Sequence, residues 1–100
     1  MATSKKVLTT KDIEKKFKAI SEWQLNKKQT ELSKTFTFDS FIKGLGFVAK
    51  IAVHAEIMGH HPDIELSYGK VKVILTTHDV KGLSVLDFDL AKRIDGLRID

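Results

Sequence analysis

The feature that most constrains the fold is a long helical pattern in the middle of the chain that ends abruptly. Residues 40 to 58 carry apolar side chains at the spacing of one helix face, namely Phe41, Leu45, Val48, Ala49, Ala52 and Val53. Asp39 is placed to cap the start of this helix, and Gly59 is a natural terminator. Pro62 then biases the preceding residue, His61, towards an extended conformation. A central helix must therefore give way to extended chain around two adjacent histidines.

Short alternating segments on both sides of this helix predict two β-hairpins. Before it, residues 23–25 and 32–38 alternate around a polar turn, and Lys34 interrupts the apolar side, as suits the exposed part of an edge strand. After it, residues 64–68 and 71–78 alternate around Gly69-Lys70, which is typical of a two-residue type II′ turn.

The second hairpin has a predicted register with consequences for the histidines. The turn at Gly69-Lys70 predicts three facing apolar pairs: Tyr68 with Val71, Leu66 with Val73, and Ile64 with Leu75. Continued backwards, the same register sets His61 opposite His78. Histidines from two parts of the chain are thus expected to lie close together.

Two further helices are expected near the ends of the chain. Thr9 with Asp12 forms a variant capping box before a helix that ends near Ile20, and Ser84 with Asp87 repeats the device before a last helix. The last helix has an apolar stripe made of Leu86, Leu90, Ile94 and Leu97. The order α-β-β-α-β-β-α predicts an α+β fold, with three helices on one face of a four-stranded antiparallel sheet.

Composition narrows the remaining possibilities. One hundred residues, 42% of them hydrophobic and 30% charged, fit a single domain over residues 1–100. The absence of cysteine excludes disulfides and thiolate metal sites, and neither a signal peptide nor a membrane segment is apparent, so we expect a cytoplasmic protein. The net charge is +4, but the lysines are dispersed in pairs, and nucleic acid is not an expected partner.

Glu56, His60, His61 and His78 form the predicted site. At about 100° per residue, Glu56 falls within roughly 20° of Leu45, so we expect its carboxylate on the packed side of the helix, where it needs a partner. His60, four residues on, is a candidate partner if the last turn stays helical. Imidazoles titrate near neutrality and can donate and accept protons on one substrate, which favours elimination or isomerisation.

Several simpler interpretations stay open for these residues. The adjacent histidines could be polar loop, Glu56 could be a structural acceptor, and Asp87 is explained by capping alone. Three imidazoles and a carboxylate would suffice for zinc, but successive side chains diverge from an extended chain, so a metal site is not favoured. His54 projects near lysines and is expected to be a surface histidine.

The residues resemble the signature of the pterin-4a-carbinolamine dehydratases. The resemblance covers about residues 20 to 97 and rests on Glu56-x-x-x-His60-His61-Pro62, Tyr68, His78, Asp87, Trp23, Phe36-Thr37-Phe38, Phe41, Gly46-Phe47 and Ala55. It implies dehydration of a 4a-hydroxytetrahydropterin to a quinonoid dihydropterin without cofactor or metal, and assembly into a homodimer or homotetramer. It also implies roles: His60 and His78 as general acids, His61 as a pterin contact, and Glu56 and Asp87 as supporting residues.

Two departures and one rival function complete the predictions. Gly59 stands where the family often has Asp before the histidine pair, and Ile64 stands where an aromatic is often found after the proline. Contacts with the pterin are therefore expected to differ from those of other members. The rival function is a non-catalytic, coactivator-like protein-interaction module, since vertebrate members of the family that this chain resembles also act as dimerisation cofactors for a transcription factor.

Overall fold

A computed structural model describes residues 6–97 of the protein. The helices are α1 (Thr10–Phe17), α2 (Phe41–Met58) and α3 (Val85–Asp95), with short 3-10 turns η1 (Lys18–Ile20) and η2 (His78–Val80). The strands are β1 (Gln24–Leu25), β2 (Leu32–Thr37), β3 (Asp63–Ser67) and β4 (Lys70–Leu75). This order confirms the predicted α-β-β-α-β-β-α arrangement.

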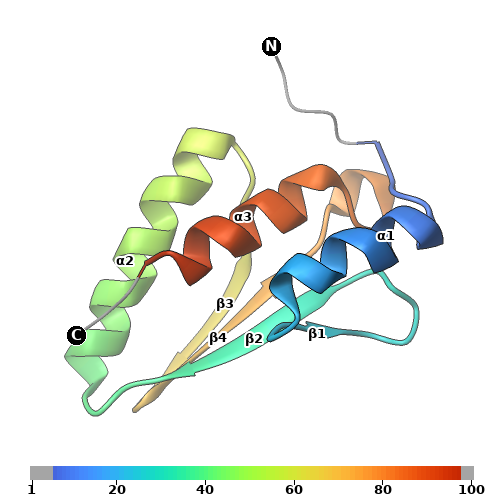
Figure 1. Ribbon diagram of the computed structural model, residues 1–100. Helices are drawn as coiled ribbons and strands as arrows, with labels where there is room; N and C mark the ends of the chain where they lie inside the picture. Colours follow the sequence, from blue (N-terminus) through green and yellow to red (C-terminus); the bar gives the residue numbers. More distant parts are fainter. Residues whose placement is uncertain (1–5, 98–100) are drawn as a thin grey trace.

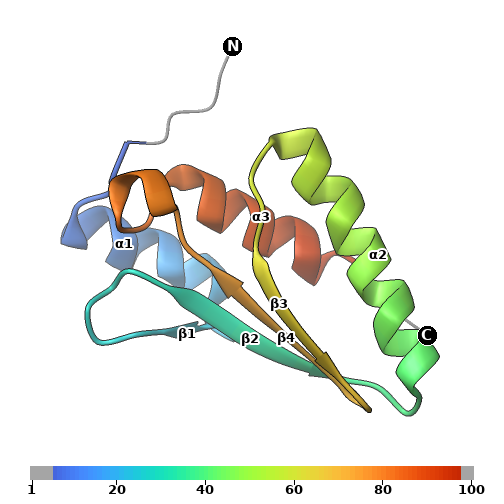
Figure 2. The same cartoon turned by 180° about the vertical axis from the view of Figure 1, so that it is seen from behind.

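The four strands form one antiparallel sheet in the order β1-β2-β4-β3. All three helices lie on the same face of the sheet (Figures 1 and 2), which confirms the predicted α+β fold. The core between the layers takes apolar side chains from every part of the chain, among them Ile13, Trp23, Leu32, Phe47, Ile51, Val71, Val73, Leu75, Phe88 and Leu90. None of the helices within residues 6–97 is long and apolar enough to cross a membrane.

The register of the second hairpin differs by two residues from the prediction. Ser67 pairs with Lys70, so the two-residue turn is Tyr68-Gly69, with Gly69 at a φ of +77°. Leu66 therefore faces Val71 rather than Val73. An even shift keeps every side chain on its predicted face, but the ladder ends at Asp63, and His61 is not paired with His78. The predicted pairing of these histidines is wrong.

Helix α2 packs on the sheet with a different face from the predicted one. The buried residues are Gly44, Phe47, Ile51 and Ala55. Most of the predicted stripe instead faces outward, with Phe41, Leu45 and Val53 exposed, whereas Val48 is partly buried against the core. Glu56 shares that stripe, as its helical phase indicates, and is therefore exposed rather than packed. The helix is apolar on two sides, and only one of them contacts the sheet.

Two smaller predictions need correction. Ser40 rather than Asp39 caps α2, because its hydroxyl accepts from the Lys43 amide. Lys34 is not on the outside of an edge strand: it points towards α3, where its Nζ lies 2.8 Å from Asp95 Oδ1. The same carboxylate accepts from the Trp23 indole N–H at 3.0 and 3.1 Å, which ties the first hairpin to the last helix.

Gly59 ends α2 and turns the chain towards the histidines. It adopts the left-handed conformation at φ 64° and ψ 29°, and the next amide, that of His60, donates to the Ala55 carbonyl. This is the backbone arrangement in which glycine is preferred after a helix. The conformation, rather than a side chain, is therefore what position 59 supplies.

We expect Gly59→Ala to lower the free energy of unfolding by about 1 kcal/mol, because a Cβ disfavours the left-handed region. No atom lies within 4 Å of such a Cβ, so strain is the whole effect. Gly46→Ala is the matched control: its Cβ also meets nothing within 4 Å, but Gly46 is inside α2, where Ala stabilises by about 0.5–1 kcal/mol. Urea unfolding should show changes of opposite sign in the free energy of unfolding of the two variants. Changes of the same sign would contradict this account.

Candidate active site

His60 and Asp87 form a buried pair at the point where α2 ends and α3 begins. His60 Nε2 lies 2.7 Å from Asp87 Oδ1, and the two side chains are 8% and 0% exposed. Asp87 reaches this place because it occupies the third position of α3, where its carboxylate also accepts from the Ser84 amide in a capping box. Capping alone therefore does not account for Asp87, and the predicted Glu56–His60 pair is not formed.

The second ring nitrogen of His60, Nδ1, is not part of the pair with Asp87. A carboxylate only accepts, so His60 Nε2 carries the proton in this pair, and Nδ1 holds a lone pair in the neutral ring. Nδ1 makes no hydrogen bond within residues 6–97. The His60 side chain as a whole is 8% exposed.

His61 and Glu56 form a second pair, on the outside of the molecule. His61 Nε2 lies 2.5 Å from Glu56 Oε2, with side chains 61% and 75% exposed. The left-handed turn at Gly59 sends His60 inward, while His61 returns towards the last turn of α2. Water screens an exposed pair of this kind, so its value lies in orienting the His61 ring rather than in stability.

His78 faces a carboxylate that the sequence did not predict. His78 Nε2 lies 3.8 Å from Asp63 Oδ2, and both side chains are exposed. Asp63 begins β3 and His78 begins η2, so the two elements bring together residues that no local motif connects. An alternating strand pattern marks Asp63 as an outward residue, but only the fold gives it a partner.

The residues predicted for the site thus lie around the end of the sheet where β3 starts and β4 ends. They are Glu56, His60, His61, His78 and Asp87. Thr77 links two of them: its hydroxyl donates to Asp87 Oδ2 at 2.6 Å, and the next residue is His78. Tyr68 does not belong here, since it sits in the turn at the other end of the same hairpin. Ile64, the second departure from the family pattern, packs against the core.

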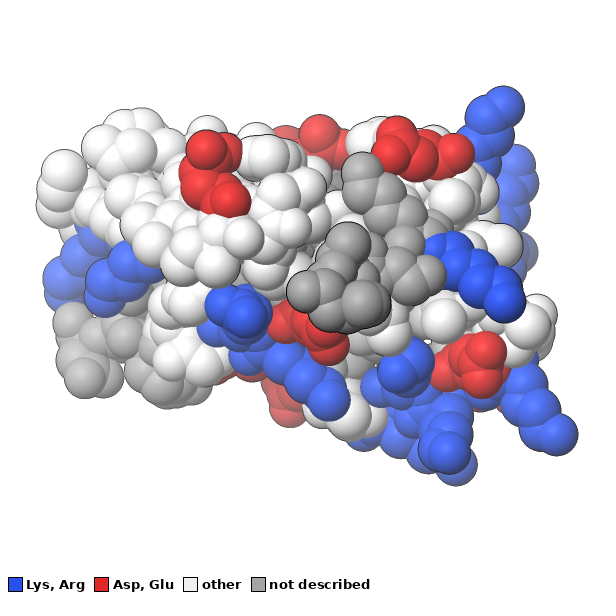
Figure 3. Space-filling view, turned by 90° about the horizontal axis from the view of Figure 1, so that it is seen from above, with Lys and Arg blue, Asp and Glu red and all other residues white. Residues whose placement is uncertain are grey.

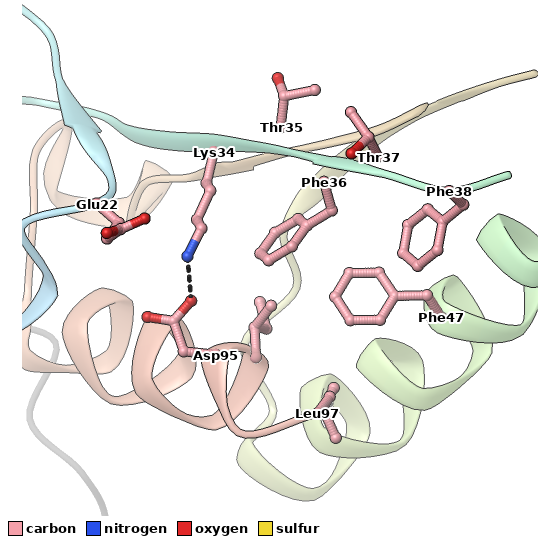
Figure 4. Close-up of a pocket in the computed structure, with 10 residues that line it drawn as sticks. Glu22, Lys34, Thr35, Phe36, Thr37, Phe38, Phe47, Asp95 and Leu97 are labelled. Atoms are coloured by element: carbon pink, nitrogen blue, oxygen red, sulfur yellow. Dashed lines mark hydrogen bonds and ion pairs between the residues drawn. The ribbon is translucent and has the colours of Figure 1, made fainter. Parts of the chain in front are cut away.

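A separate cavity of about 600 Å³ opens between β2, α2 and α3. Figure 4 shows the rings of Phe36, Phe38 and Phe47 lining it, with Lys34 reaching across to Asp95. The charges of Lys34 and Asp95 are paired with each other, and no histidine lines the cavity. The cavity has carboxylates, those of Glu22 and Asp95, but none of the predicted site residues lines it.

Charged side chains are dispersed over the surface. Figure 3 shows basic side chains spread between acidic ones, beside a broad, largely uncharged area on the left, where α2 lies. Within residues 6–97, no group of three or more His, Asp or Glu side chains is placed to hold a metal ion. The described surface therefore carries no continuous basic block in this view.

The fold and the cluster define a class: a small α+β domain with histidine–carboxylate pairs at one end of its sheet. The family model for pterin 4 alpha carbinolamine dehydratase matches residues 6–97. The chain belongs to this family.

Individual relatives agree over nearly the whole chain. A Nostoc punctiforme protein provisionally named pterin-4-alpha-carbinolamine dehydratase is 44% identical over 92% of this chain and 97% of its own. A protein with the same provisional name from Acidobacterium capsulatum is 41% identical over 90% and 96%. The match therefore spans the full length of these relatives, not a fragment.

Solved structures in the same family have more than one described role. The crystal structure of a transcriptional coactivator/pterin dehydratase from Brucella melitensis superposes with a TM-score of 0.85, at 30% identity over 91% of this chain and 97% of that one. A pterin dehydratase-like protein described as a RuBisCO assembly factor in the alpha-carboxysome gives a TM-score of 0.65, at 26% identity over 76% and 88%. Catalysis and protein assembly both occur among these descriptions.

Proposed function

We propose that the protein is a hydro-lyase that removes water from a 4a-hydroxytetrahydropterin to give a quinonoid dihydropterin. The observation that carries the proposal is the state of His60: one ring nitrogen is bound by a fully buried carboxylate, and the other has no hydrogen-bond partner within residues 6–97. A histidine held in this way is prepared for proton transfer. Family membership supplies the substrate class.

The reaction needs two proton transfers on one flat heterocycle. The C4a–O bond breaks as the hydroxyl receives a proton and leaves as water. The neighbouring ring nitrogen forms the new double bond to C4a and loses its own proton. No electrons are gained or lost overall, so histidines and a bound substrate account for every atom.

The three histidines have different surroundings, which suit them to different steps of the reaction. We assign His60 to removal of the proton from the ring nitrogen through its Nδ1 lone pair, His78 to delivery of the proton to the hydroxyl, and His61 to contact with the pterin. The role of His60 differs from the general-acid role that the resemblance implies, because the one proton of its neutral ring is donated to Asp87. Glu56 and Asp87 orient the rings of His61 and His60, respectively. Asp63 joins this supporting group through its place beside His78.

The direct test is a stopped-flow assay in which a 4a-hydroxytetrahydropterin is generated and its dehydration followed by absorbance. The proposal requires that the protein accelerates the reaction over buffer, and that the acceleration depends on the predicted histidines. A rate equal to that in buffer, or one unchanged in both His60→Ala and His78→Ala, would remove the enzyme assignment and leave the interaction function.

A second function, in protein association, rests on the outward face of α2. This face exposes large apolar side chains: Phe41, Ile42, Leu45, Val53 and Ile57. An apolar helix face is typical of a buried position, yet the sheet covers only one of the two apolar sides of α2. We propose that a second copy of the chain covers this face, in a homodimer or homotetramer, and that a coactivator-like partner is the alternative occupant.

We expect Val53→Asp to shift the protein towards the monomer by at least about tenfold in dissociation constant, because it places a charge within the buried apolar surface. Light scattering coupled to size-exclusion chromatography measures the mass directly. Val7→Asp is the control, since Val7 is also an exposed apolar residue, at 49% against 57% for Val53, and lies beside Gly82 rather than on α2. A monomeric wild-type protein, or equal effects of both changes, would rule out self-association through this face.

A further inference from the structure

The buried polar groups of the protein form one connected network around His60. Four polar or charged residues are buried within the described chain: His60, Thr77, Ser84 and Asp87. Every one of them contacts another member of the set. Buried polar groups are costly unless each is satisfied, so a network gathered at the candidate active site calls for an explanation beyond stability.

The number of protons on each group decides which group donates in each hydrogen bond of the network. The Thr77 hydroxyl has a single proton, and it donates this to Asp87 Oδ2 at 2.6 Å. In the 2.7 Å contact between the Thr77 and Ser84 hydroxyls, Ser84 must then be the donor. The Ser84 amide donates to the same Oδ2 at 3.0 Å. Oδ1 of Asp87 is left for His60 Nε2–H.

Thr77 is held in place independently of this network. Its backbone forms a bridge with Gly82, in which the Thr77 amide donates to the Gly82 carbonyl at 2.9 Å. Its conformation is extended, at φ −107° and ψ 97°, so its side chain and that of His78 leave the chain on different sides. Thr77 points inward to Asp87, and His78 points outward.

We propose that Thr77 is a positioning residue that fixes Asp87 and, through it, keeps His60 in the Nε2–H tautomer with Nδ1 available for the reaction. This inference rests on the proposed function for its catalytic consequence, but not for the tautomer. Without the Thr77 hydroxyl, Oδ2 keeps only the Ser84 amide, and the carboxylate can rotate. His60 then loses the fixed acceptor that selects its tautomer.

Thr77→Val tests this proposal because it removes the hydroxyl and keeps the shape. We expect kcat to fall about tenfold with little change in KM, as loss of an outer hydrogen-bonding partner commonly costs 10–100-fold. Ring ¹⁵N shifts of His60 should move from the Nε2–H pattern towards a mixture of tautomers. Thr77→Ser, which restores the hydroxyl, should recover both measurements.

Thr76→Val is the matched control, since the neighbouring Thr76 hydroxyl donates to the Thr30 carbonyl at 2.6 Å, with a longer contact of 3.4 Å to the Gly82 carbonyl, and contacts neither Asp87 nor His60. It should leave kcat and the His60 tautomer unchanged. If Thr77→Val folds poorly, Thr77→Cys provides the same comparison with a weaker donor. An unchanged tautomer in the Thr77 variant overturns the proposal, even if kcat falls. If the wild-type protein is not a dehydratase, the proposed function fails, and the tautomer comparison still decides the role of Thr77.

Discussion

His60→Ala should lower kcat for dehydration by about 10²- to 10⁴-fold, the usual contribution of a positioned acid or base. His60 Nε2 is committed to Asp87, while Nδ1 has no hydrogen-bond partner within residues 6–97. The substrate would lose the base that takes the proton from its ring nitrogen, whereas the contact assigned to His61 would stay. KM should therefore change much less than kcat, as measured in the stopped-flow assay.

The control for this variant is the fourth histidine of the chain. His54 lies on α2, and its Nδ1 accepts from Arg93 at 3.2 Å, with no tie to the buried network. His54→Ala should retain wild-type kcat. Because His60→Ala leaves Asp87 Oδ1 without a partner, circular dichroism must establish that the variant is folded at the assay temperature. A folded His60→Ala with kcat within twofold of wild type would contradict the role given to His60.

Asp87→Asn should reduce kcat to a similar extent by a different route. With the amide oxygen facing the Thr77 hydroxyl and the Ser84 amide, the NH₂ group must face His60 Nε2. Two donors cannot share a hydrogen bond, so His60 is driven to the Nδ1–H tautomer and its lone pair moves to the wrong nitrogen. A comparable change of tautomer in serine proteases costs about 10⁴-fold.

The stability of Asp87→Asn should fall by only about 1 kcal/mol, since a charge-assisted hydrogen bond is replaced by a neutral one of similar shape. Thermal unfolding and the kinetic assay together separate the two effects. Asp89→Asn, two positions along the same helix on its exposed side, is the control and should alter neither quantity. If Asp87→Asn lost much of its stability but its folded fraction kept a normal kcat, Asp87 would act only as a helix cap.

The sequence was most informative where one pattern had a single physical solution. Helix α3 has one apolar stripe, one cap and one possible orientation, and its predicted residues Leu86, Leu90 and Ile94 are buried. The cap at Thr9 is also confirmed by its bond to the Asp12 amide. The strands kept their faces despite the wrong register, because the true turn and the predicted one differ by an even number of residues.

The sequence failed where two solutions were equally good. Helix α2 is apolar on both sides, so its period gives the relative positions of Leu45 and Glu56 but not which side meets the sheet. The sequence also did not predict partners that are distant in the chain. Asp63 and Thr77 contact their partners only because the fold brings β3, η2 and α3 together. The left-handed Gly59 broke the helical spacing on which the predicted Glu56–His60 pair depended.

The position of Glu56 on the outward face of α2 links assembly to the candidate site. Glu56 lies one turn from Val53 and Ala52 on that face, and it also holds the His61 ring. Any molecule that covers the face withdraws water from around this pair and changes the strength of its hydrogen bond. By thermodynamic linkage, a ligand bound against His61 must then change the affinity of the covering molecule by the same factor. With the proposed pterin site and the proposed self-association, pterin binding and assembly are expected to shift each other's equilibrium.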